Sequence, residues 1–423
     1  MKKTSLFQEL QSRNFVYQGT DLDSIQNILN NNKITFYVGV DPTADSLHIG
    51  HLVALMLFKK LQQAGHIGIL LFGGATGLIG DPSGKQEMRQ LLTDTQVKYN
   101  ITNLINSAKG FVNPTCNHDN PTIIANNADW FDGTKFIDFM RDIGTHFNVN
   151  KMLAADAYAN RLNNGGLTFL EMSYMLMQSY DFVQLNKLHN CTLQIGGSDQ
   201  WGNIVAGTRL YRKLKFGNDE HNDKKDELQN IYGLTCPLLL TKTGKKMGKT
   251  EKGTLWLDAN KTTPYDFYQY FYNVDDADIE TLFNTFTDIP THTIQDLIQT
   301  DIISAKKKMA FEITALVHGK DKAQECVDTA QSLFAGGNAD TNAPTIQLQL
   351  SQLKDGINIA QLCVLSTQVK STSQARQLIQ SGAIALGQNK IIDITYTVTT
   401  KDLTDNHIIL KKGKKNYIKV IFK

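Results

Sequence analysis

The sequence YVGVDPTADSLHIGH occupies residues 37–51 and has the pattern of a strand that turns into a helix. The apolar residues before Asp41 predict a buried strand, the Asp-Pro pair marks a turn, and the helix is expected over about 47–64. A helix begins with unpaired N–H groups and a positive dipole end, which favour a bound anion. His48 and His51 share one face at that end, either as ligand-binding residues or as two solvent-facing histidines.

Strand and helix patterns alternate around this stretch. Strands are expected at 34–40, 67–72 and 193–195, and helices at 49–64, 93–109 and 170–187. Alternation at this spacing predicts β–α–β units, a mostly parallel sheet and therefore a doubly wound α/β fold. The polar stretch 217–227 predicts a solvated loop.

Composition narrows the class of protein. The chain has 423 residues, 41% of them hydrophobic, which excludes a disordered chain. A net charge of +2 indicates a nucleic-acid partner only if basic residues gather locally. The five cysteines form no C-x-x-C pair, which favours a reducing compartment over disulfides or a zinc site, so no metal site is predicted. The longest apolar run, 67–80, contains five glycines and is too short to span a bilayer, so a cytoplasmic protein without a membrane segment is expected.

The pattern changes after residue 262. Residues 263–333 read as helices, and the glycine-rich stretch 336–344 reads as a linker. The C-terminal part predicts a helix at 359–365 and a second helix at 374–381, with Thr372-Ser373 as its N-cap. A strand is expected at 383–386 and a turn at 387–390. The sequence thus predicts five parts, namely a doubly wound domain (1–225), a connector (226–262), a helical domain (263–336), a linker (337–355) and a small α+β domain (356–423).

A second candidate site is the lysine-rich stretch TGKKMGKTE at 243–251. Glycines beside the lysines predict a mobile loop whose compact charges suit a polyphosphate, although such loops are often merely exposed. HIGH at 48–51 and KMGKT at 246–250 on a doubly wound scaffold resemble the class I aminoacyl-tRNA synthetases, whose HIGH and KMSKS signatures bind ATP and drive amino-acid activation. Gly248 and Thr250 stand in place of the two serines, and both lysines remain.

Residues 171–182 are apolar nearly all round and predict a buried helix that carries a polar stripe. Tyr174, Gln178 and Asp181 fall at positions i, i+4 and i+7 of this helix. Buried polar groups need partners, so the stripe forms either an internal hydrogen-bond network or one wall of a pocket for a polar ligand.

Three further motifs extend the resemblance to bacterial-type tyrosyl-tRNA synthetases over nearly the full chain. They are YVGVDPT at 37–43, GGATGLIGDPSGK at 73–85 and LQIGGSDQWGN at 193–203. The resemblance implies a Rossmann-like catalytic domain in 1–225 and a connector in 226–262 that carries the KMGKT loop. It also implies tyrosine and ATP as substrates, Mg²⁺ that accompanies ATP, and a homodimer.

The same resemblance assigns roles to single residues. Tyr37 and Asp181 would hold the phenolic hydroxyl of the substrate. Phenylalanine has no such hydroxyl, so its binding would leave buried polar groups unpaired. The other tyrosine-binding residues would be Asp81, Tyr174 and Gln178, which surround the ammonium group, and Gln194. The ATP-binding residues would be Gly39, Asp41, Gly50, Gly197, Asp199, Gln200 and Lys249. The catalytic residues around the phosphates and ribose would be Thr43, His48, His51, Lys85, Arg89, Lys246, Lys249 and Thr250. Taken alone, Asp81 also fits a turn, and Lys85 with Arg89 also fits an exposed basic face.

Residues 371–379, STSQARQLI, and the glycine at 382 resemble the S4-type RNA-binding domain. This implies tRNA binding through basic residues, namely Lys370, Arg376, Lys390, Lys411, Lys412, Lys414 and Lys415. Without the resemblance, the same lysines fit a solvated basic tail.

The activity implied is two-step: tyrosine and ATP give tyrosyl-adenylate and pyrophosphate, and the tyrosyl group then passes to the 3′ end of tRNA(Tyr) in translation. A tryptophan-specific ligase is a close alternative, which Tyr37 with Asp181 argues against. An RNA-binding protein that has lost catalysis is another, which the intact HIGH and KMGKT motifs argue against. An oligomeric scaffold would explain none of the motifs.

Overall fold

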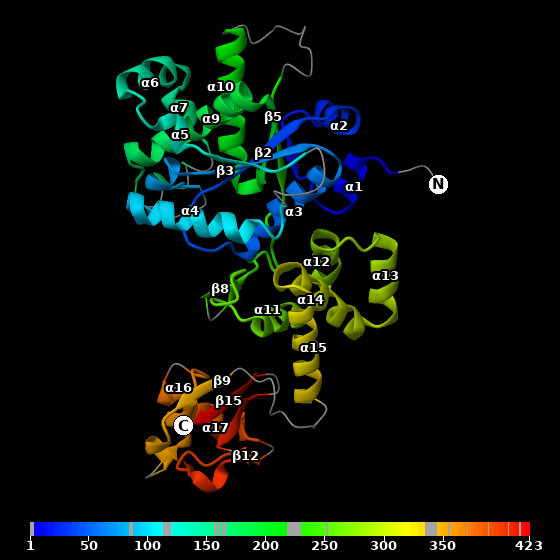
Figure 1. The fold of residues 1–423 in the computed structure, drawn as a ribbon, viewed down its shortest axis with the longest axis vertical. Helices are drawn as coiled ribbons and strands as arrows, with labels where there is room; N and C mark the ends of the chain where they lie inside the picture. Colours follow the sequence, from blue (N-terminus) through cyan, green and yellow to red (C-terminus); the bar gives the residue numbers. More distant parts are fainter. Residues whose placement is uncertain are drawn as a thin grey trace. The chain divides into compact units, whose positions relative to one another are not determined.

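The computed structural model describes residues 4–83, 88–112, 120–155, 158, 161–162, 166–217, 230–250, 253–334, 345–353, 356–369, 371–387, 389–404, 406–413 and 416–423. The chain forms two compact units, 1–319 and 320–423 (Figure 1). The expected linker at 336–344 lies outside the described residues, as does the expected loop at 217–227 beyond its first residue. The five-part domain division stays a prediction.

The first unit is built on a six-stranded sheet with the order β1-β6-β5-β2-β3-β4. Neighbouring strands run parallel except for β1 and β6. The strands are β1 Gln18–Gly19, β2 Thr35–Val40, β3 Ile67–Phe72, β4 Ile123–Asn126, β5 Cys191–Gly197 and β6 Tyr232–Cys236. The strand order reverses between β2 and β5, which confirms the doubly wound class. In such sheets, ligands bind beyond the carboxyl ends of the strands at the reversal.

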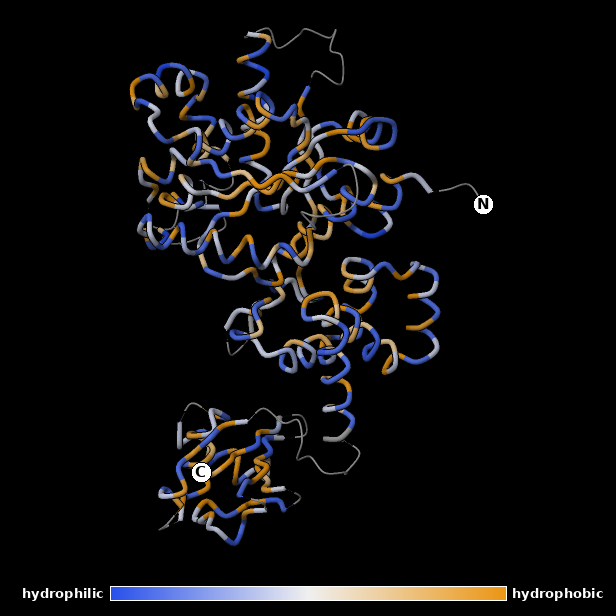
Figure 2. Tube along the Cα trace, in the orientation of Figure 1, coloured by the Kyte–Doolittle hydropathy of each residue, from blue (hydrophilic) through white to orange (hydrophobic). Residues whose placement is uncertain are grey.

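Helices cover both faces of this sheet. Phe36 of β2 packs on Phe58 of α3 (Ile49–Gln63), with ring centroids 4.8 Å apart. The next residue, Tyr37, packs on Phe182 of α9 (Phe169–His189) at 5.1 Å. Because successive strand residues point to opposite faces, α3 and α9 lie on opposite sides of the sheet. Hydrophobic residues accordingly make up much of the central strands and appear orange in Figure 2.

The remaining elements of the first unit surround this layer. Helix α10 (Trp201–Phe216) packs against α9. The others before the lysine loop are α1 Leu6–Ser12, α2 Leu22–Asn31, α4 Asp94–Ala108, α5 Ala128–Phe131, α6 Phe136–Asp142 and α7 Val149–Leu153. The short strands β7 Lys249–Thr250 and β8 Gly253–Thr254 come next, followed by α11 Pro264–Tyr272, α12 Ile279–Phe286, α13 Thr291–Thr300 and α14 Ile302–His318. The predicted helices 49–64, 93–109 and 170–187 and the helical pattern after 263 are thereby confirmed. No helix in the described part of the chain is both long and apolar enough to cross a membrane.

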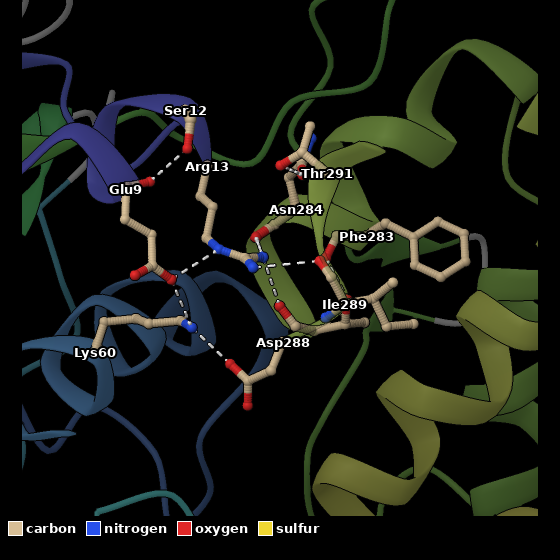
Figure 3. A network of polar contacts seen from close by, with 10 residues as sticks. Glu9, Ser12, Arg13, Lys60, Phe283, Asn284, Asp288, Ile289 and Thr291 are labelled. Carbon is tan, nitrogen blue, oxygen red and sulfur yellow. Dashed lines mark hydrogen bonds and ion pairs between the residues drawn. The ribbon is translucent and has the colours of Figure 1, made fainter. Parts of the chain in front are cut away.

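A buried polar cluster joins α12 to the sheet layer (Figure 3). The guanidinium of Arg13, at the end of α1, donates to the carbonyl of Thr287 at 2.9 Å and is paired with Glu9 at 3.2 Å. Lys60 of α3 pairs with Asp288 at 2.6 Å. Both cations are nearly buried, at 6% and 8% exposure, so the carbonyl and carboxylate partners supply the hydrogen bonds that water would otherwise make.

The second unit contains α15 (Lys320–Phe334) and a small α+β part with its own core. A five-stranded sheet has the order β12-β11-β14-β15-β9, and β10 pairs with β13. The elements are β9 Thr345–Leu348, β10 Ile357–Asn358, α16 Ile359–Leu365, α17 Thr372–Gln380, β11 Ile384–Leu386, β12 Asn389–Ile391, β13 Thr397–Val398, β14 His407–Lys412 and β15 Asn416–Phe422. Leu362, Ile379 and Val420 are fully buried in one apolar cluster.

The structure alters several expectations for this unit. Helix α17 is capped by Ser371, whose hydroxyl accepts from the Gln374 amide at 3.3 Å, because this residue and not Thr372-Ser373 has the extended backbone of a cap. The expected turn 387–390 is shorter, since residues 389 and 390 already pair with β11. Strand β9 lies inside the stretch expected as a linker and pairs with β15.

Candidate active site

A cavity of about 430 Å³ lies at the carboxyl ends of β2 and β5, where the strand order reverses. Its volume is in the range of small-molecule sites. The cavity brings together most of the residues predicted from the sequence, namely Tyr37, Gly39, Asp41, Thr43, His48, Gly50, His51, Asp81, Arg89, Tyr174, Gln178, Asp181, Gln194, Gly197, Asp199, Gln200 and Lys246. Lys85 lies outside the described residues, and Lys249 and Thr250 are placed on β7 without described side chains.

The two histidines of HIGH cap the first turn of α3. The Nδ1 atom of His48 accepts from the Gly50 amide, and the Nδ1 atom of His51 accepts from the His48 amide, both at 3.1 Å. Their rings stack at 3.8 Å. Burial and the neighbouring His48 lower the pKa of His51 to about 3, so His51 is neutral at physiological pH. Since Nδ1 accepts in both rings, the neutral form of each carries its hydrogen on Nε2.

A buried carboxylate defines one end of the cavity. Asp181 of α9 accepts from Asn127 Nδ2 at 3.1 Å and from Trp130 Nε1 at 2.9 Å, and it is only 2% exposed. Burial raises the pKa of Asp181 to about 8, against the effect of the two donors. The hydroxyl of Tyr37 is buried with no partner among the described residues, and burial and Asp181 raise its pKa well above the usual value. An unsatisfied hydroxyl beside a buried acceptor suits a ligand that carries a hydroxyl of its own.

A second acidic group lies on the same side of the cavity. Tyr174 donates to Asp41 Oδ2 and Thr76 donates to Asp41 Oδ1, both at 2.9 Å. Burial and the charge of Asp81 raise the pKa of Asp41 to about 6. Asp81 in turn accepts from Gln200 Nε2 at 2.7 Å. Two carboxylates that share a buried region favour a cationic ligand between them.

The polar stripe of α9 faces this region. The hydroxyl of Tyr174 and the carboxylate of Asp181 both reach it, and Gln178 Nε2 donates to Gln200 Oε1 at 3.4 Å. The Oε1 atom of Gln178 is buried and has no partner among the described residues. The stripe therefore combines an internal network with an unsatisfied acceptor that points to a ligand.

The lysine loop, defined here as residues 241–248, lies over the start of α3. Gly248 has φ +82°, and a Cβ at this position would overlap the Ile49 side chain. The Leu255 amide donates to the Gly248 carbonyl at 2.7 Å, and the Ile49 amide donates to the Leu255 carbonyl at 3.2 Å. Lys246 Nζ lies 3.8 Å from Asp199 Oδ2. The two sequence motifs thus form one wall of the cavity.

Space for a planar group exists next to this wall. A Cβ added to Gly39 would meet no atom within 4 Å, and one added to Gly197 would lie 2.8 Å from Asp199 Oδ1. Asp199 lies beyond the carboxyl end of β5, as expected for a nucleotide-binding acid. Arg89 Nε donates to the Asp81 carbonyl at 2.8 Å, which places this cation in the cavity and not on an exposed helix face.

Sequence reasoning missed Thr76, Asn127 and Trp130, which hold Asp41 and Asp181 in place. Asn127 and Trp130 follow the end of β4, and Thr76 follows the end of β3. A signal was available for Thr76, because it follows the predicted strand 67–72 and polar residues just after parallel strands meet at the carboxyl edge of the sheet. It was not available for Asn127 and Trp130, because strand β4 was not predicted.

The basic residues of the second unit are partly brought together. Lys390, Ala385 and Lys411 are register partners across β12, β11 and β14, so Lys390 and Lys411 lie on one face of the sheet. Lys412 belongs to the opposite face and donates to the Gln368 carbonyl at 2.8 Å. Arg376 is exposed on α17. Lys370, Lys414 and Lys415 lie outside the described residues.

Comparison with known proteins identifies the class to which this fold and site belong. Residues 29–335 match the family described as tRNA synthetases class I (W and Y). Residues 338–420 match the Tyrosine--tRNA ligase SYY-like C-terminal domain. The site is therefore that of a class I aminoacyl-tRNA synthetase, which uses ATP as a substrate.

Individual relatives narrow the assignment. The Tyrosine--tRNA ligase of Clostridium botulinum (strain Alaska E43 / Type E3) is 41% identical over 419 residues, 98% of this chain and 99% of the relative. That of Acetivibrio thermocellus is 41% identical over 420 residues, 99% of each chain. The chain belongs to the tyrosine–tRNA ligase family.

Solved structures agree in fold. A C-terminally truncated mitochondrial tyrosyl-tRNA synthetase from Aspergillus nidulans has a TM-score of 0.69 at 29% identity and covers 79% of this chain and 95% of that chain. A tryptophanyl-tRNA synthetase from Plasmodium falciparum has a TM-score of 0.53 at 14% identity, over 77% and 85% of the two chains, and shares the fold alone. The resemblance inferred from the sequence is thereby confirmed.

Proposed function

We propose that the cavity binds L-tyrosine and ATP together, forms tyrosyl-adenylate and pyrophosphate, and then transfers the tyrosyl group to the 3′ end of tRNA(Tyr). The observation that carries this proposal is the buried pair Tyr37 and Asp181 in the same cavity as the capped start of α3. A phenol donates to Asp181 and accepts from Tyr37, which satisfies both groups. Phenylalanine would leave the Tyr37 hydroxyl without a partner and Asp181 with only Asn127 and Trp130, so specificity for tyrosine follows.

The ammonium group of tyrosine is assigned to the acidic side of the cavity. Asp81 supplies negative charge and Gln178 supplies the buried Oε1 acceptor. Asp41, which the resemblance places among the ATP-binding residues, is reassigned to the ammonium group, because it is bonded to Tyr174 and lies close enough to Asp81 for their charges to interact. Tyr174 fixes Asp41 by its hydrogen bond. Gln194, nearly buried on β5, completes the lining.

The pH profile of tyrosine activation tests this assignment. Because the pKa of Asp41 is raised to about 6, we expect kcat/KM for tyrosine to fall as pH drops below 6, where Asp41 is protonated and loses its attraction for the ammonium. The Asp41→Asn variant should have a low and flatter profile over the same range. A variant profile that parallels the wild type would contradict the assignment.

The raised pKa of Asp41 also predicts that the stability of the protein without substrate changes with pH in the opposite direction. The folded pKa exceeds the usual value of 3.8, so the stability contributed by Asp41 is full below pH 4 and is lost as pH rises through 6. Asp41→Asn should remove this trend in thermal unfolding.

ATP is assigned to the opposite side. Gly39 and Gly197 leave room for the adenosine, and Asp199 accepts from the ribose hydroxyls. The phosphates face Thr43, the Nε2–H groups of His48 and His51, Arg89 and the lysine loop, with Lys85, Lys249 and Thr250 assigned to the same group. We propose that Mg²⁺ enters with ATP, and no residue of this chain is assigned to it.

Chemistry on this site needs no nucleophile from the protein. The carboxylate of bound tyrosine attacks the α-phosphorus, and negative charge grows on the departing pyrophosphate. Groups that bind this charge more strongly in the transition state than in the ground state raise the rate. Orientation of the two substrates supplies the remainder of the rate enhancement.

The experiment that tests the function is ATP–pyrophosphate exchange with purified protein and tyrosine, phenylalanine or tryptophan. Exchange that depends on tyrosine is expected, with phenylalanine and tryptophan near background. Exchange that prefers tryptophan would overturn the pocket assignment. A folded protein without any exchange would favour the alternative of an RNA-binding protein that has lost catalysis.

We also propose a homodimer, formed through an apolar surface on one edge of the first unit. Phe136 and Ile137 of α6, Val149 of α7 and Phe169 of α9 are 50–69% exposed. These three helices pack around one buried cluster, so their exposed residues belong to one region. Exposed apolar residues gathered in this way are typical of protein interfaces. A cytoplasmic location remains a prediction.

Sedimentation velocity tests the dimer. Ile137→Asp is expected to convert the dimer to a monomer, since a charge in an apolar interface is costly to desolvate. Ile303→Asp on α14 is the matched control, because Ile303 is also exposed but lies on another element, and it should remain dimeric. A dimeric Ile137→Asp protein would exclude this surface.

A further inference from the structure

We propose that Tyr270 and Asp278 are positioning residues for tyrosine activation, because they hold the backbone of the lysine loop. The proposal rests on the proposed function of that loop in binding the phosphates of ATP. Neither residue lines the cavity, and neither belongs to a sequence motif of the site.

The two contacts lie at the two ends of the loop. The hydroxyl oxygen of Tyr270, near the end of α11, accepts from the Gly248 amide at 2.8 Å. The Oδ1 atom of Asp278, the residue before α12, accepts from the Lys242 amide at 2.9 Å. Asp278 is only 7% exposed, and its hydrogen bond to the Lys242 amide is partly buried. The helical part of the unit therefore holds the loop through its main chain, and neither contact uses a lysine side chain.

The Tyr270 contact is coupled to the HIGH motif by backbone hydrogen bonds. The carbonyl of Gly248 accepts from Leu255, whose own carbonyl accepts from Ile49, the first residue of α3. A shift of Gly248 would thus move the loop relative to the histidines at the start of α3. Lys246, two residues before Gly248, lies 3.8 Å from Asp199 and shares the cavity with His48.

The loop has backbone hydrogen bonds of its own, from the Thr241 amide to the Lys245 carbonyl and from the Met247 amide to the Leu239 carbonyl, both at 2.8 Å. These bonds fix its local shape, and anchoring by Tyr270 and Asp278 fixes its position relative to the rest of the unit. Lysines that must be ordered when the phosphates bind lose part of their binding free energy to that ordering. A loop held at both ends has less freedom to lose, so more of the interaction is available in the transition state. Burial and the nearby Asp278 raise the pKa of Tyr270, so its hydroxyl is neutral at physiological pH.

The test compares Tyr270→Phe and Asp278→Ala with a matched control, Tyr272→Phe. Tyr272 lies two residues further on the same helix and stacks on Tyr268, with ring centroids 6.2 Å apart. Pyrophosphate exchange should slow about tenfold in each of the first two variants, with the KM for tyrosine within about twofold of wild type, as expected for one lost hydrogen bond. Tyr272→Phe should match the wild type.

A second measurement separates positioning from general stability. Limited trypsin digestion should cleave the loop after Lys245 or Lys246 faster in Tyr270→Phe and Asp278→Ala, at an unchanged midpoint of thermal unfolding. Wild-type exchange and cleavage rates in both variants would overturn the proposal. A rate loss accompanied by a lower unfolding midpoint and a raised KM for tyrosine would also overturn it. If the wild-type protein shows no exchange, the proposed function fails, while the cleavage comparison still decides whether the two residues anchor the loop.

Discussion

Replacing Asp181 with alanine is expected to lower kcat/KM for tyrosine about 1,000-fold while the KM for ATP changes by no more than about twofold. The carboxylate is almost fully buried and accepts from Asn127 and Trp130. In the variant, both of these donors and the phenolic hydroxyl of the substrate lose their acceptor. Pyrophosphate exchange measured at varied tyrosine and saturating ATP, and then at varied ATP and saturating tyrosine, gives the two constants separately.

The reciprocal control is Asp199→Ala, which should raise the KM for ATP and leave the KM for tyrosine unchanged. Asp199 lies at the end of β5, beside the lysine loop and not beside Asp181. A protein with Asp181→Ala that loses tyrosine and ATP binding equally would contradict the pocket assignment.

Thermal unfolding shows whether a loss in Asp181→Ala reflects misfolding. The folded pKa of Asp181, about 8, exceeds the usual value of 3.8, so the stability that this group contributes is lost as pH rises through 8. The unfolding midpoint of the alanine variant should therefore improve relative to wild type as pH rises from 4 to 8. If the unfolding midpoint of the alanine variant instead falls further below that of the wild type as pH rises, the ionised carboxylate supports the fold.

A protein that ends at residue 344 is expected to keep tyrosine-dependent pyrophosphate exchange and to charge tRNA at least about 100-fold more slowly. The removed part has its own apolar core and its own sheets. Because β9 begins at Thr345 and pairs with β15, the cut falls before β9 and not at residue 356.

The full-length double variant Lys390→Ala and Lys411→Ala is the matched control for this truncation. These two residues share one face of the sheet, so charging should weaken and become less dependent on salt, with exchange unchanged. A truncated protein that charges tRNA at the wild-type rate would show that the second unit does not bind tRNA.

Half of the six-stranded sheet, namely β2, β3 and β5, could be predicted from the sequence because parallel strands are buried on both faces, whereas β1, β4 and β6 were not predicted. Strand 67–72 was placed at its observed bounds, and helix α12 matches an apolar pattern that repeats every three to four residues. The site could be predicted where its residues lie on such regular elements, as with the stripe of α9.

The remainder depended on tertiary structure. The strands β14 and β15 were not predicted, because their alternating lysines and apolar residues read equally well as a basic tail. Trp130 and Asn127 are local neighbours of β4, and only the folded sheet shows that they reach Asp181. The contacts of Tyr270 and Asp278 go to main-chain amides, which carry no sequence signal at all.

Gly248 has a consequence for how this gene can vary. Its φ of +82° and its contact with Ile49 leave no room for a side chain. Every missense change at a glycine codon introduces a Cβ, so we expect this codon to have no neutral single-nucleotide replacement. Serine, which the KMSKS signature carries at this position, would overlap Ile49 and would also have to adopt the positive φ. A second change that makes residue 49 smaller would relieve the overlap and not the backbone strain.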